Sequence, residues 1–179
     1  MKVLLLLGAF AACAFAQDQA APACPGDPGV YYLDAGTWKP LSLITPTSSS
    51  DDNAPHGMFT WSKKNIVVQY PEAAAHTNLP AHPKFCTSGT ATDVNSIFVV
   101  KLSEKGDHRE LQVGKGTAAT AAKVKYRQED LQPINVTPSG SDALEITPKQ
   151  DLPPGQYLVV AQNQSNRSDP NAGYDFGVK

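Results

Sequence analysis

Histidine, methionine and cysteine side chains, the usual ligands of copper and zinc, gather in one stretch of the sequence. His56, His76 and His82 lie in this stretch, with Met58 close to the first and Cys86 close to the last. Imidazole, thioether and thiolate groups together suit either ion. The spacings match no compact signature such as His-x-His or His-x-x-x-His. The pattern therefore favours solvated loop histidines and predicts no metal site, with copper or zinc handling as the alternative function.

Catalytic motifs receive even less support. No Gly-x-Ser-x-Gly elbow is present, and the carboxylate pairs Asp51-Asp52 and Glu129-Asp130 lie in polar runs typical of solvated surface. A glycosidase needs two carboxylates that face each other about 5 to 10 Å apart. We therefore predict no catalytic residue and no cofactor, and a small hydrolase is only the third function considered.

Aromatic side chains allow two interpretations. In a β-structured domain most of them pack in the core, because aromatics supply much of its buried area. The alternative is a platform on one sheet face that stacks against carbohydrate rings. The residues concerned are Tyr31, Tyr32, Trp38, Trp61, Tyr70 and Tyr157.

The start of the chain predicts export. Met1-Lys2 precedes an apolar run that ends in small residues, and Ala14-Phe15-Ala16 suits a signal peptidase. We expect residues 1–16 to be a cleaved signal peptide and the mature protein to be secreted or periplasmic. The apolar run is shorter than the roughly 18 to 20 residues that span a bilayer, so no transmembrane segment is predicted.

Cys13 offers an alternative to simple cleavage. Phe10-Ala11-Ala12-Cys13 resembles a bacterial lipobox, in which the cysteine becomes the lipidated first residue. Phe is a poor substitute for the usual Leu, which favours removal of Cys13 with the signal peptide. A lipid anchor at Cys13 is the alternative. The short signal with its single lysine is typical of bacteria.

Cys24 and Cys86 are the two cysteines of the predicted mature chain. In an oxidising compartment an isolated pair is more often a disulfide than two free thiols. The chain-entropy model assigns about 4 kcal/mol to a crosslink of this span. We expect the bond to staple an N-terminal arm, residues 17–28, to the domain, with two free thiols as the alternative.

Charge and size narrow the class of protein. The net charge is −2 and becomes more acidic when Lys2 leaves with the signal, which argues against nucleic acid or anionic membrane as a partner. The remaining length suffices for one core. We expect a single domain at residues 29–179.

Alternating apolar residues between turn signals predict about nine short strands and no convincing helix. The residues 29–33 and 37–41 form a hairpin around the three-residue loop Asp34-Ala35-Gly36, with Gly36 left-handed. A turn is expected at Lys63-Lys64-Asn65, and a mobile loop at 43–57. The other predicted strands are 58–61, 66–70, 96–102, 108–113, 134–137, 143–147, 157–161 and 174–178.

Three motifs carry a resemblance. They are the opening hairpin with Tyr31-Tyr32 and Trp38, the run 152–159 (LPPGQYLV), and the closing run 174–178 (YDFGV). Together they resemble uncharacterised exported bacterial proteins, and the second is similar to a strand entry of immunoglobulin-like modules. The resemblance implies an all-β fold, an antiparallel immunoglobulin-like sandwich.

The leading functional hypothesis follows from the signal and the strand pattern. It is an exported, non-enzymatic module, an envelope or extracellular interaction domain whose partner is an unknown protein or glycan. Loops are where such modules commonly place recognition.

Overall fold

The computed structural model describes residues 22–51, 64–90, 93–116, 126–161 and 172–179. These residues form an all-β structure with fourteen strands and one short 3₁₀ helix, η1 (Val94–Ser96). The first seven strands are β1 (Gly29–Asp34), β2 (Thr37–Pro40), β3 (Ser42–Ile44), β4 (Ser48–Asp51), β5 (Lys64–Pro71), β6 (Asn78–Leu79) and β7 (Phe85–Ser88). The other seven are β8 (Ile97–Lys105), β9 (His108–Gly116), β10 (Leu131–Gln132), β11 (Ile134–Pro138), β12 (Ala143–Pro148), β13 (Gly155–Ala161) and β14 (Gly173–Val178).

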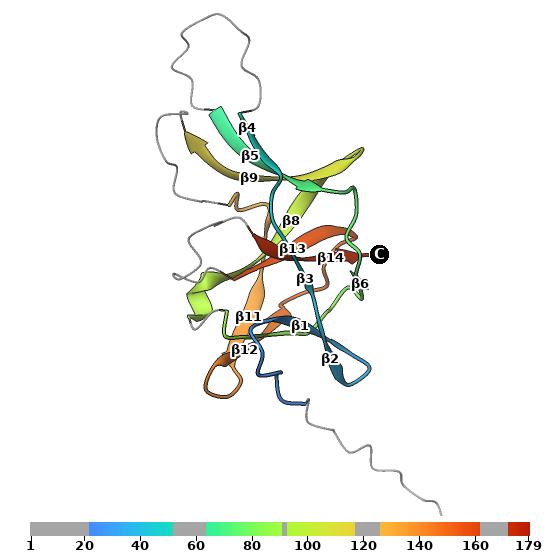
Figure 1. Cartoon of the computed structure of the whole chain (residues 1–179), viewed down its shortest axis with the longest axis vertical. Coiled ribbons are helices and arrows are strands. Elements are labelled where there is room, and N and C mark those ends of the chain that lie inside the picture. The colour runs from blue at the N-terminus through green and yellow to red at the C-terminus, as the bar shows by residue number, and fades with distance from the viewer. Residues whose placement is uncertain (1–21, 52–63, 91–92, 117–125, 162–171) are drawn as a thin grey trace, which may run out of the picture.

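The strands form two sheets (Figure 1). The smaller sheet has the order β11-β12-β7-β1-β2, and the larger sheet has the order β3-β14-β13-β8-β9-β5-β4, with β10 beside β8 and β6 beside β14. Among the described strands all pairs are antiparallel except β6 with β14. Antiparallel sheets were predicted, and this part of the prediction is confirmed.

The larger sheet curls because β8 changes partners along its length. Its first part, Ile97 to Leu102, pairs with β13, whereas only Ser103 to Lys105 pair with β9. The strands β9, β5 and β4 therefore leave the plane of β13 and β14, as the upper part of Figure 1 shows, and give the sheet the form of a half-barrel.

Two hydrophobic cores result, one on each face of the central strands. The first core lies between the two sheets and includes Phe85, Val99 and Tyr157; the second lies inside the curl and includes Val100 and Leu158. Neighbouring residues of β8 and of β13 thus point into opposite cores. The sequence reflects this, because strands buried on both faces read as continuous apolar runs rather than as alternating patterns.

The opening hairpin forms where it was predicted, with a tighter loop. Asp34 pairs with Thr37, so the loop has two residues, Ala35 and Gly36, instead of three. Their φ angles are 47° and 81°. Positive φ at both positions is what a type I′ turn requires, because this turn matches the twist of the flanking strands. Gly36 is left-handed as expected, and Ala35 shares that conformation.

Several boundaries differ from the predictions. Strand β4 and the last two residues of β3 lie inside the expected loop 43–57, and Lys64 and Asn65 belong to β5 rather than to a turn. Small polar residues and isolated apolar ones gave these segments no readable alternation, yet edge pairing with β14 and β5 needs only backbone groups. Together with β6, β7 and β10, they raise the number of described strands well above nine.

Other predictions fall on parts of the chain that lie outside the described residues. These are the signal peptide 1–16 with Cys13, the first part of the arm, the strand 58–61 and the end of the loop 43–57. Within the part of the chain that is described, no helix is long and apolar enough to cross a membrane.

Candidate functional site

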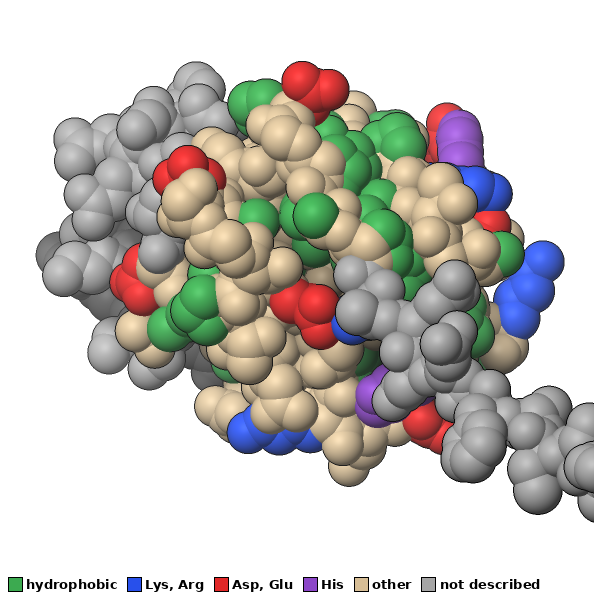
Figure 2. Space-filling model, turned by 90° about the horizontal axis from the view of Figure 1, so that it is seen from below, with side chains coloured by type: hydrophobic (Ala, Val, Ile, Leu, Met, Phe, Trp, Pro, Cys, Tyr) green, Lys and Arg blue, Asp and Glu red, His purple; other side chains and the backbone are tan. Residues whose placement is uncertain are grey.

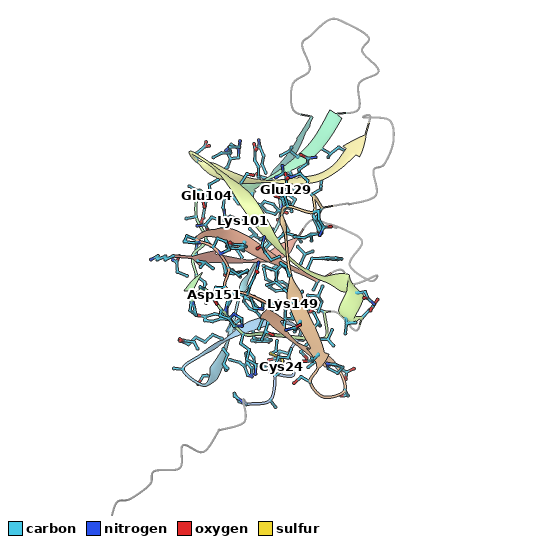
Figure 3. All side chains as sticks on the ribbon, turned by 180° about the vertical axis from the view of Figure 1, so that it is seen from behind. Cys24, Lys101, Glu104, Glu129, Lys149 and Asp151 are labelled. Atoms are coloured by element: carbon cyan, nitrogen blue, oxygen red, sulfur yellow. A yellow bond between two sulfur atoms is a disulfide. The ribbon has the colours of Figure 1, made fainter. Side chains whose placement is uncertain are left out.

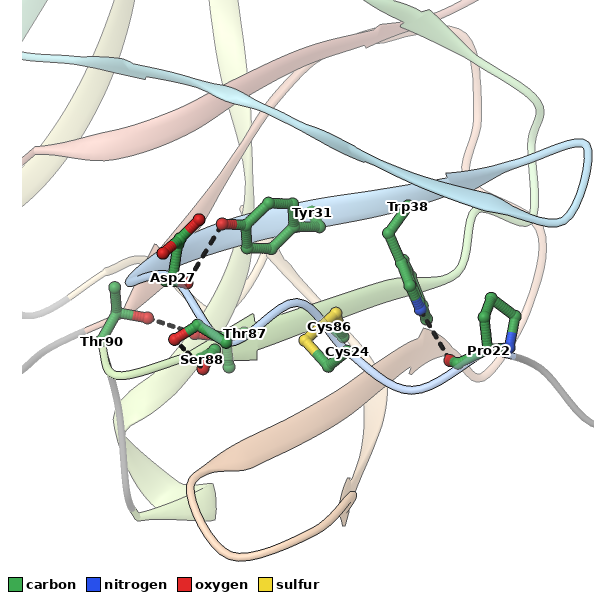
Figure 4. Close-up of a disulfide and its surroundings, with 10 residues drawn as sticks. Pro22, Cys24, Asp27, Tyr31, Trp38, Cys86, Thr87, Ser88 and Thr90 are labelled. Atoms are coloured by element: carbon green, nitrogen blue, oxygen red, sulfur yellow. Dashed lines mark hydrogen bonds between the residues drawn. A yellow bond between two sulfur atoms is a disulfide. The ribbon is translucent and has the colours of Figure 1, made fainter.

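The N-terminal arm crosses the outer surface of the smaller sheet and is fastened there by a disulfide (Figure 4). Cys24 bonds to Cys86 of β7, with 6.0 Å between the two Cα atoms, which confirms the predicted pair. Val30 of β1 and Phe85 of β7 face the first core. Side chains alternate along a strand, so Tyr31 and Cys86 face outwards. We call this outer surface, with residues 22–28 on it, the arm face.

Three further contacts hold the arm, and each uses a side chain of the sheet and a carbonyl of the arm. Trp38 Nε1 donates to the Pro22 carbonyl at 2.7 Å, and the Tyr31 hydroxyl donates to the Asp27 carbonyl at 3.1 Å. The Ser88 hydroxyl lies 3.5 Å from the Gly26 carbonyl, a long contact. Residues 22–28, the described part of the arm, form no strand, so these contacts replace the strand pairing that would otherwise satisfy their backbone.

The arm face carries partly exposed aromatic and aliphatic side chains. Leu33 lies opposite Trp38, and Tyr31 lies between Pro40 and Cys86 in the sheet register. Figure 2 views the molecule from the end that carries β1 and β2, and shows hydrophobic side chains through the middle of this face with charged groups mostly towards its margin. Such mixed surfaces suit recognition, because aromatic anchors contribute much of the energy of binding sites.

The edge of the arm face carries an ion pair between Lys84, which directly precedes β7, and Glu145 of β12. Lys84 Nζ lies 2.8 Å from Glu145 Oε1, and both side chains are about one-third exposed. Glu145 is the register neighbour of Cys86 on β12. The buried sulfur of the disulfide is therefore flanked by Tyr31 on one strand and by Glu145 on the other. In Figure 3, Cys24 lies at the lower end of the molecule, beside the smaller sheet.

A buried ion pair forms a second cluster, at the open side of the curled larger sheet. Arg109 of β9 is 1% exposed and Asp175 of β14 is 5% exposed. Arg109 Nη1 donates to Asp175 Oδ1 at 2.5 Å, while its Nε and Nη2 donate to the carbonyls of Glu72 and Pro71, each at 3.0 Å. One guanidinium thus joins β9, β14 and the end of β5.

Residues 72–77, which follow β5, are bonded to β9, β13 and β14 at this open side of the curled sheet. Besides the two carbonyls held by Arg109, the Ala75 amide donates to Gln156 Oε1 at 2.7 Å, and the Gly177 amide donates to the Thr77 carbonyl at 2.8 Å. Glu72 has a φ of 68°, in the left-handed region that non-glycine residues seldom adopt. This backbone cost is offset by the two charge-assisted bonds that Arg109 makes to neighbouring carbonyls.

The electrostatics of this cluster follow from its burial. Burial raises the pKa of Asp175 and Arg109 works in the opposite direction. At the surface above them, His76 Nδ1 lies 3.2 Å from Glu72 Oε2, and both of these side chains are more than half exposed. Each of the three guanidinium nitrogens of Arg109 donates a hydrogen bond within the protein, which gives the buried pair a structural role.

A third cluster lies at the β8–β9 turn. His108 Nδ1 is 2.6 Å from Asp107 Oδ1 and His108 Nε2 is 3.1 Å from Glu110 Oε1. Hydrogen bonds to Asp107 and then to Glu110 raise the pKa of His108, and the same bond to His108 lowers the pKa of Asp107. Both ring nitrogens therefore donate when the imidazole is charged.

Of the residues considered as metal ligands, the three that the structure describes each have another partner. His56 and Met58 lie outside the described residues. His76 pairs with Glu72 and His82 with Asp151, its Nδ1 lying 3.3 Å from Asp151 Oδ1. Cys86 is in the disulfide and so is not a free thiolate ligand, which removes one member of the proposed copper or zinc set. Over the described ranges, no three His, Cys, Asp or Glu side chains are grouped to hold a metal.

The aromatic residues divide between the two interpretations. Tyr70 and Tyr157 are fully buried in the two cores, as core packing predicts. Tyr32 packs against the first core, whereas Tyr31 and Trp38 lie on the arm face and are partly exposed. Trp61 lies outside the described residues. Of the five described residues, only Tyr31 and Trp38 lie on one outer surface, so these five do not form a common stacking platform.

Sequence reasoning missed Arg109, Asp175 and strand β7. A charged residue at the start of a polar-apolar strand gives no sign that it is buried, because its partner is 66 residues away. Strand β7 is only four residues long and half polar. Pro83 before it and Gly89 after it were the available signals of a short strand.

Comparisons with known proteins give no identification: no family model, no curated protein and no solved structure matches this chain.

Proposed function

We propose that this chain is an exported, non-enzymatic module with an immunoglobulin-like β-sandwich, which acts as an interaction domain in the envelope or outside the cell. The observation that carries the proposal is the order of the strands. The smaller sheet contains β11-β12-β7-β1 and the larger sheet contains β14-β13-β8. With β1, β7, β8, β11, β12, β13 and β14 taken as strands A to G, these orders are D-E-B-A and G-F-C, as in immunoglobulin domains.

A tyrosine at the corner between strands E and F supports the same class. The Tyr157 hydroxyl donates to the Pro153 carbonyl, four residues upstream at the entry to β13, at 2.5 Å. A tyrosine near the start of strand F that bonds back to the backbone is a hallmark of immunoglobulin sandwiches. Lys101 of β8 lies over this ring, with Nζ 5.7 Å from its centroid, and donates to the Pro154 carbonyl.

The chain departs from the immunoglobulin pattern in two ways. Strands β2 to β6 are inserted between A and B, and β9, β5 and β4 extend the second sheet into its curl. The disulfide joins strand B to the arm instead of to strand F. In the core, Tyr157 and Phe176 stack with ring centroids 5.4 Å apart, beside Phe85.

Export is supported by the signal-like start of the sequence and by the disulfide, because structural disulfides persist in oxidising compartments. Fusion of residues 1–28 to an alkaline phosphatase that lacks its own signal tests this. Activity is expected from the fusion and not from the same fusion with Leu5→Asp and Leu6→Asp, which interrupt the apolar run. An inactive unmodified fusion would contradict export.

The interaction role rests on fold-level analogy together with the partly exposed Trp38 and Tyr31 on the arm face. The mature protein, fluorescently labelled, is expected to bind the envelope fraction of its own host saturably. Trp38→Ala should weaken this binding about tenfold, since aromatic anchors are typical hot spots. Leu43→Ala, at an exposed residue on β3, is the matched control and should leave it unchanged. Equal binding by both variants would place recognition elsewhere.

A further inference from the structure

The two sulfur atoms of the disulfide sit in different environments. Cys86 is 1% exposed, within a strand that is paired on both sides, whereas Cys24 is partly exposed on the arm. Thiol–disulfide exchange requires a thiolate to reach one sulfur, and access decides which sulfur is attacked. An incoming thiol therefore meets Cys24 first.

The strand pairing and the cores of the sandwich do not involve the arm that the disulfide holds. Strand β7 pairs with β1 through four residues and with β12 through four residues, and Phe85 packs in the first core beside Phe176. No residue of 22–28 belongs to either core. What the bond holds is the arm, whose residues 22–28 otherwise accept two ordinary hydrogen bonds from the partly exposed Tyr31 and Trp38 and one long one from the buried Ser88.

From these observations we propose that Cys24 is a thiol-modification site: a small-molecule thiol opens the Cys24–Cys86 bond by attack at Cys24, and the arm leaves the smaller sheet while the sandwich stays folded. This goes beyond the proposed function and does not depend on the identity of any partner. The arm is a latch, and its opening uncovers the sheet surface around Tyr31, Trp38 and Cys86.

The exchange balances as follows. The thiolate RS⁻ forms a bond to Cys24 Sγ, and the bond between Cys24 Sγ and Cys86 Sγ breaks. The electron pair leaves on Cys86 Sγ, which takes a proton from water. A second thiol then attacks the mixed disulfide, so that two thiols are oxidised to RSSR and the protein disulfide is reduced to two thiols.

Reduced glutathione is the probe. The mature, oxidised protein is incubated with it in native buffer, free thiols are then blocked by alkylation, and the two cysteine peptides are weighed. Glutathione is expected on Cys24 and the alkyl group on Cys86, with an excess of Cys24 adducts of about tenfold. Hydrogen exchange should rise at 22–28 and stay slow in β7 and β13, because the latch opens without unfolding.

A matched pair of variants tests the latch. Tyr31→Phe removes the hydrogen bond to the Asp27 carbonyl and should speed modification about three- to tenfold. Tyr32→Phe, one residue along and packed on the first core, should leave the rate unchanged. Glutathione found mainly on Cys86 would overturn the proposal. So would a rate that follows global unfolding in its denaturant dependence, or equal rates for the two tyrosine variants.

The variant with both Cys24→Ser and Cys86→Ser separates loss of the latch from loss of the fold. It is expected to keep slow exchange in β13 and fast exchange in the arm. Slow exchange in the arm of this variant would show that the arm is held without the disulfide, and the proposal would fail. Export and binding at Trp38 are measured by separate experiments, so failure of this proposal is distinguished from failure of the proposed function.

Discussion

Arg109 Nη1 lies 2.5 Å from Asp175 Oδ1, and this ion pair joins two strands that are not neighbours in the sheet. Arg109 lies on the same face of β9 as Leu111, which packs in the second core. Asp175 of β14 points to the opposite face from Phe176, which packs in the first core. Both side chains therefore point into the curl. The pair bridges the open side of the half-barrel, which backbone pairing leaves unlinked.

Arg109→Met is expected to destabilise the fold by about 3–5 kcal/mol, because it leaves a buried carboxylate and two carbonyls without their donor. Chemical denaturation measures this. Lys84→Met is the control, since Lys84 and Glu145 are both about one-third exposed and form an ion pair at the surface. It should cost about 1 kcal/mol or less.

The double variant Arg109→Met with Asp175→Leu separates two contributions to the lost free energy of unfolding, that of the unpaired carboxylate and that of the two carbonyl bonds. Replacing both members of a buried ion pair by apolar side chains is often neutral, so the part due to Asp175 should be recovered. The remaining deficit is the value of the bonds to the Pro71 and Glu72 carbonyls. A double variant as unstable as Arg109→Met alone would mean that the carbonyl bonds carry the whole effect.

His108 is expected to titrate above its ordinary value of 6.5, because Asp107 and Glu110 hold the charged ring. A raised folded-state pKa adds stability that is fully present below pH 6.5 and is lost as the pH rises through the folded value. Wild type should thus exceed His108→Gln in stability at pH 6, and the difference should vanish at alkaline pH. NMR titration of the ring checks the pKa itself.

Asp107, which bonds to His108, should affect stability at acidic pH, and its substitution provides a control for the pKa of His108. The lowered pKa of Asp107 adds stability above its ordinary 3.8, which is lost as the pH falls through the folded value. Asp107→Asn removes the carboxylate that holds the charged ring, so it should bring the pKa of His108 back towards 6.5. An unchanged pKa of His108 in this variant would show that the contact does not persist in solution.

Ala35→Asn is expected to stabilise the fold by about 0.5–1 kcal/mol. Ala35 has a φ of 47°, and asparagine tolerates the left-handed region better than alanine does. The tip of the hairpin is exposed, so no packing opposes the change. Thermal and denaturant unfolding measure the effect, and Thr37→Asn, at a position that pairs with Asp34 in the strand, should bring no gain.

Features that depend on neighbouring residues in the sequence could be predicted, whereas features that depend on partners far along the chain could not. Local signals predict the hairpin, strands β8 and β13 and the pairing of Cys24 with Cys86. These signals are turn residues, short continuous apolar runs and a count of cysteines. Strands β3 and β4 and the burial of Arg109 do not, because they depend on partners far along the chain. The arm face was missed as well, since the carbonyls that Trp38 and Tyr31 bind carry no sequence signal.

Gly155→Ala is expected to lower stability by about 1–3 kcal/mol, although it adds a single methyl group. Gly155 precedes the corner tyrosine and has a φ of 149°, which side chains seldom tolerate, and a Cβ there would lie 2.8 Å from Cε of Lys101. Lys101 is itself held over Tyr157 and on the Pro154 carbonyl, so it does not move away freely. Gly106→Ala is the control, because a Cβ at Gly106 meets nothing within 4 Å, and it should change little. Equal effects of the two substitutions in denaturant unfolding would argue against a constrained corner at the entry to β13, and with it against one support of the immunoglobulin-like proposal.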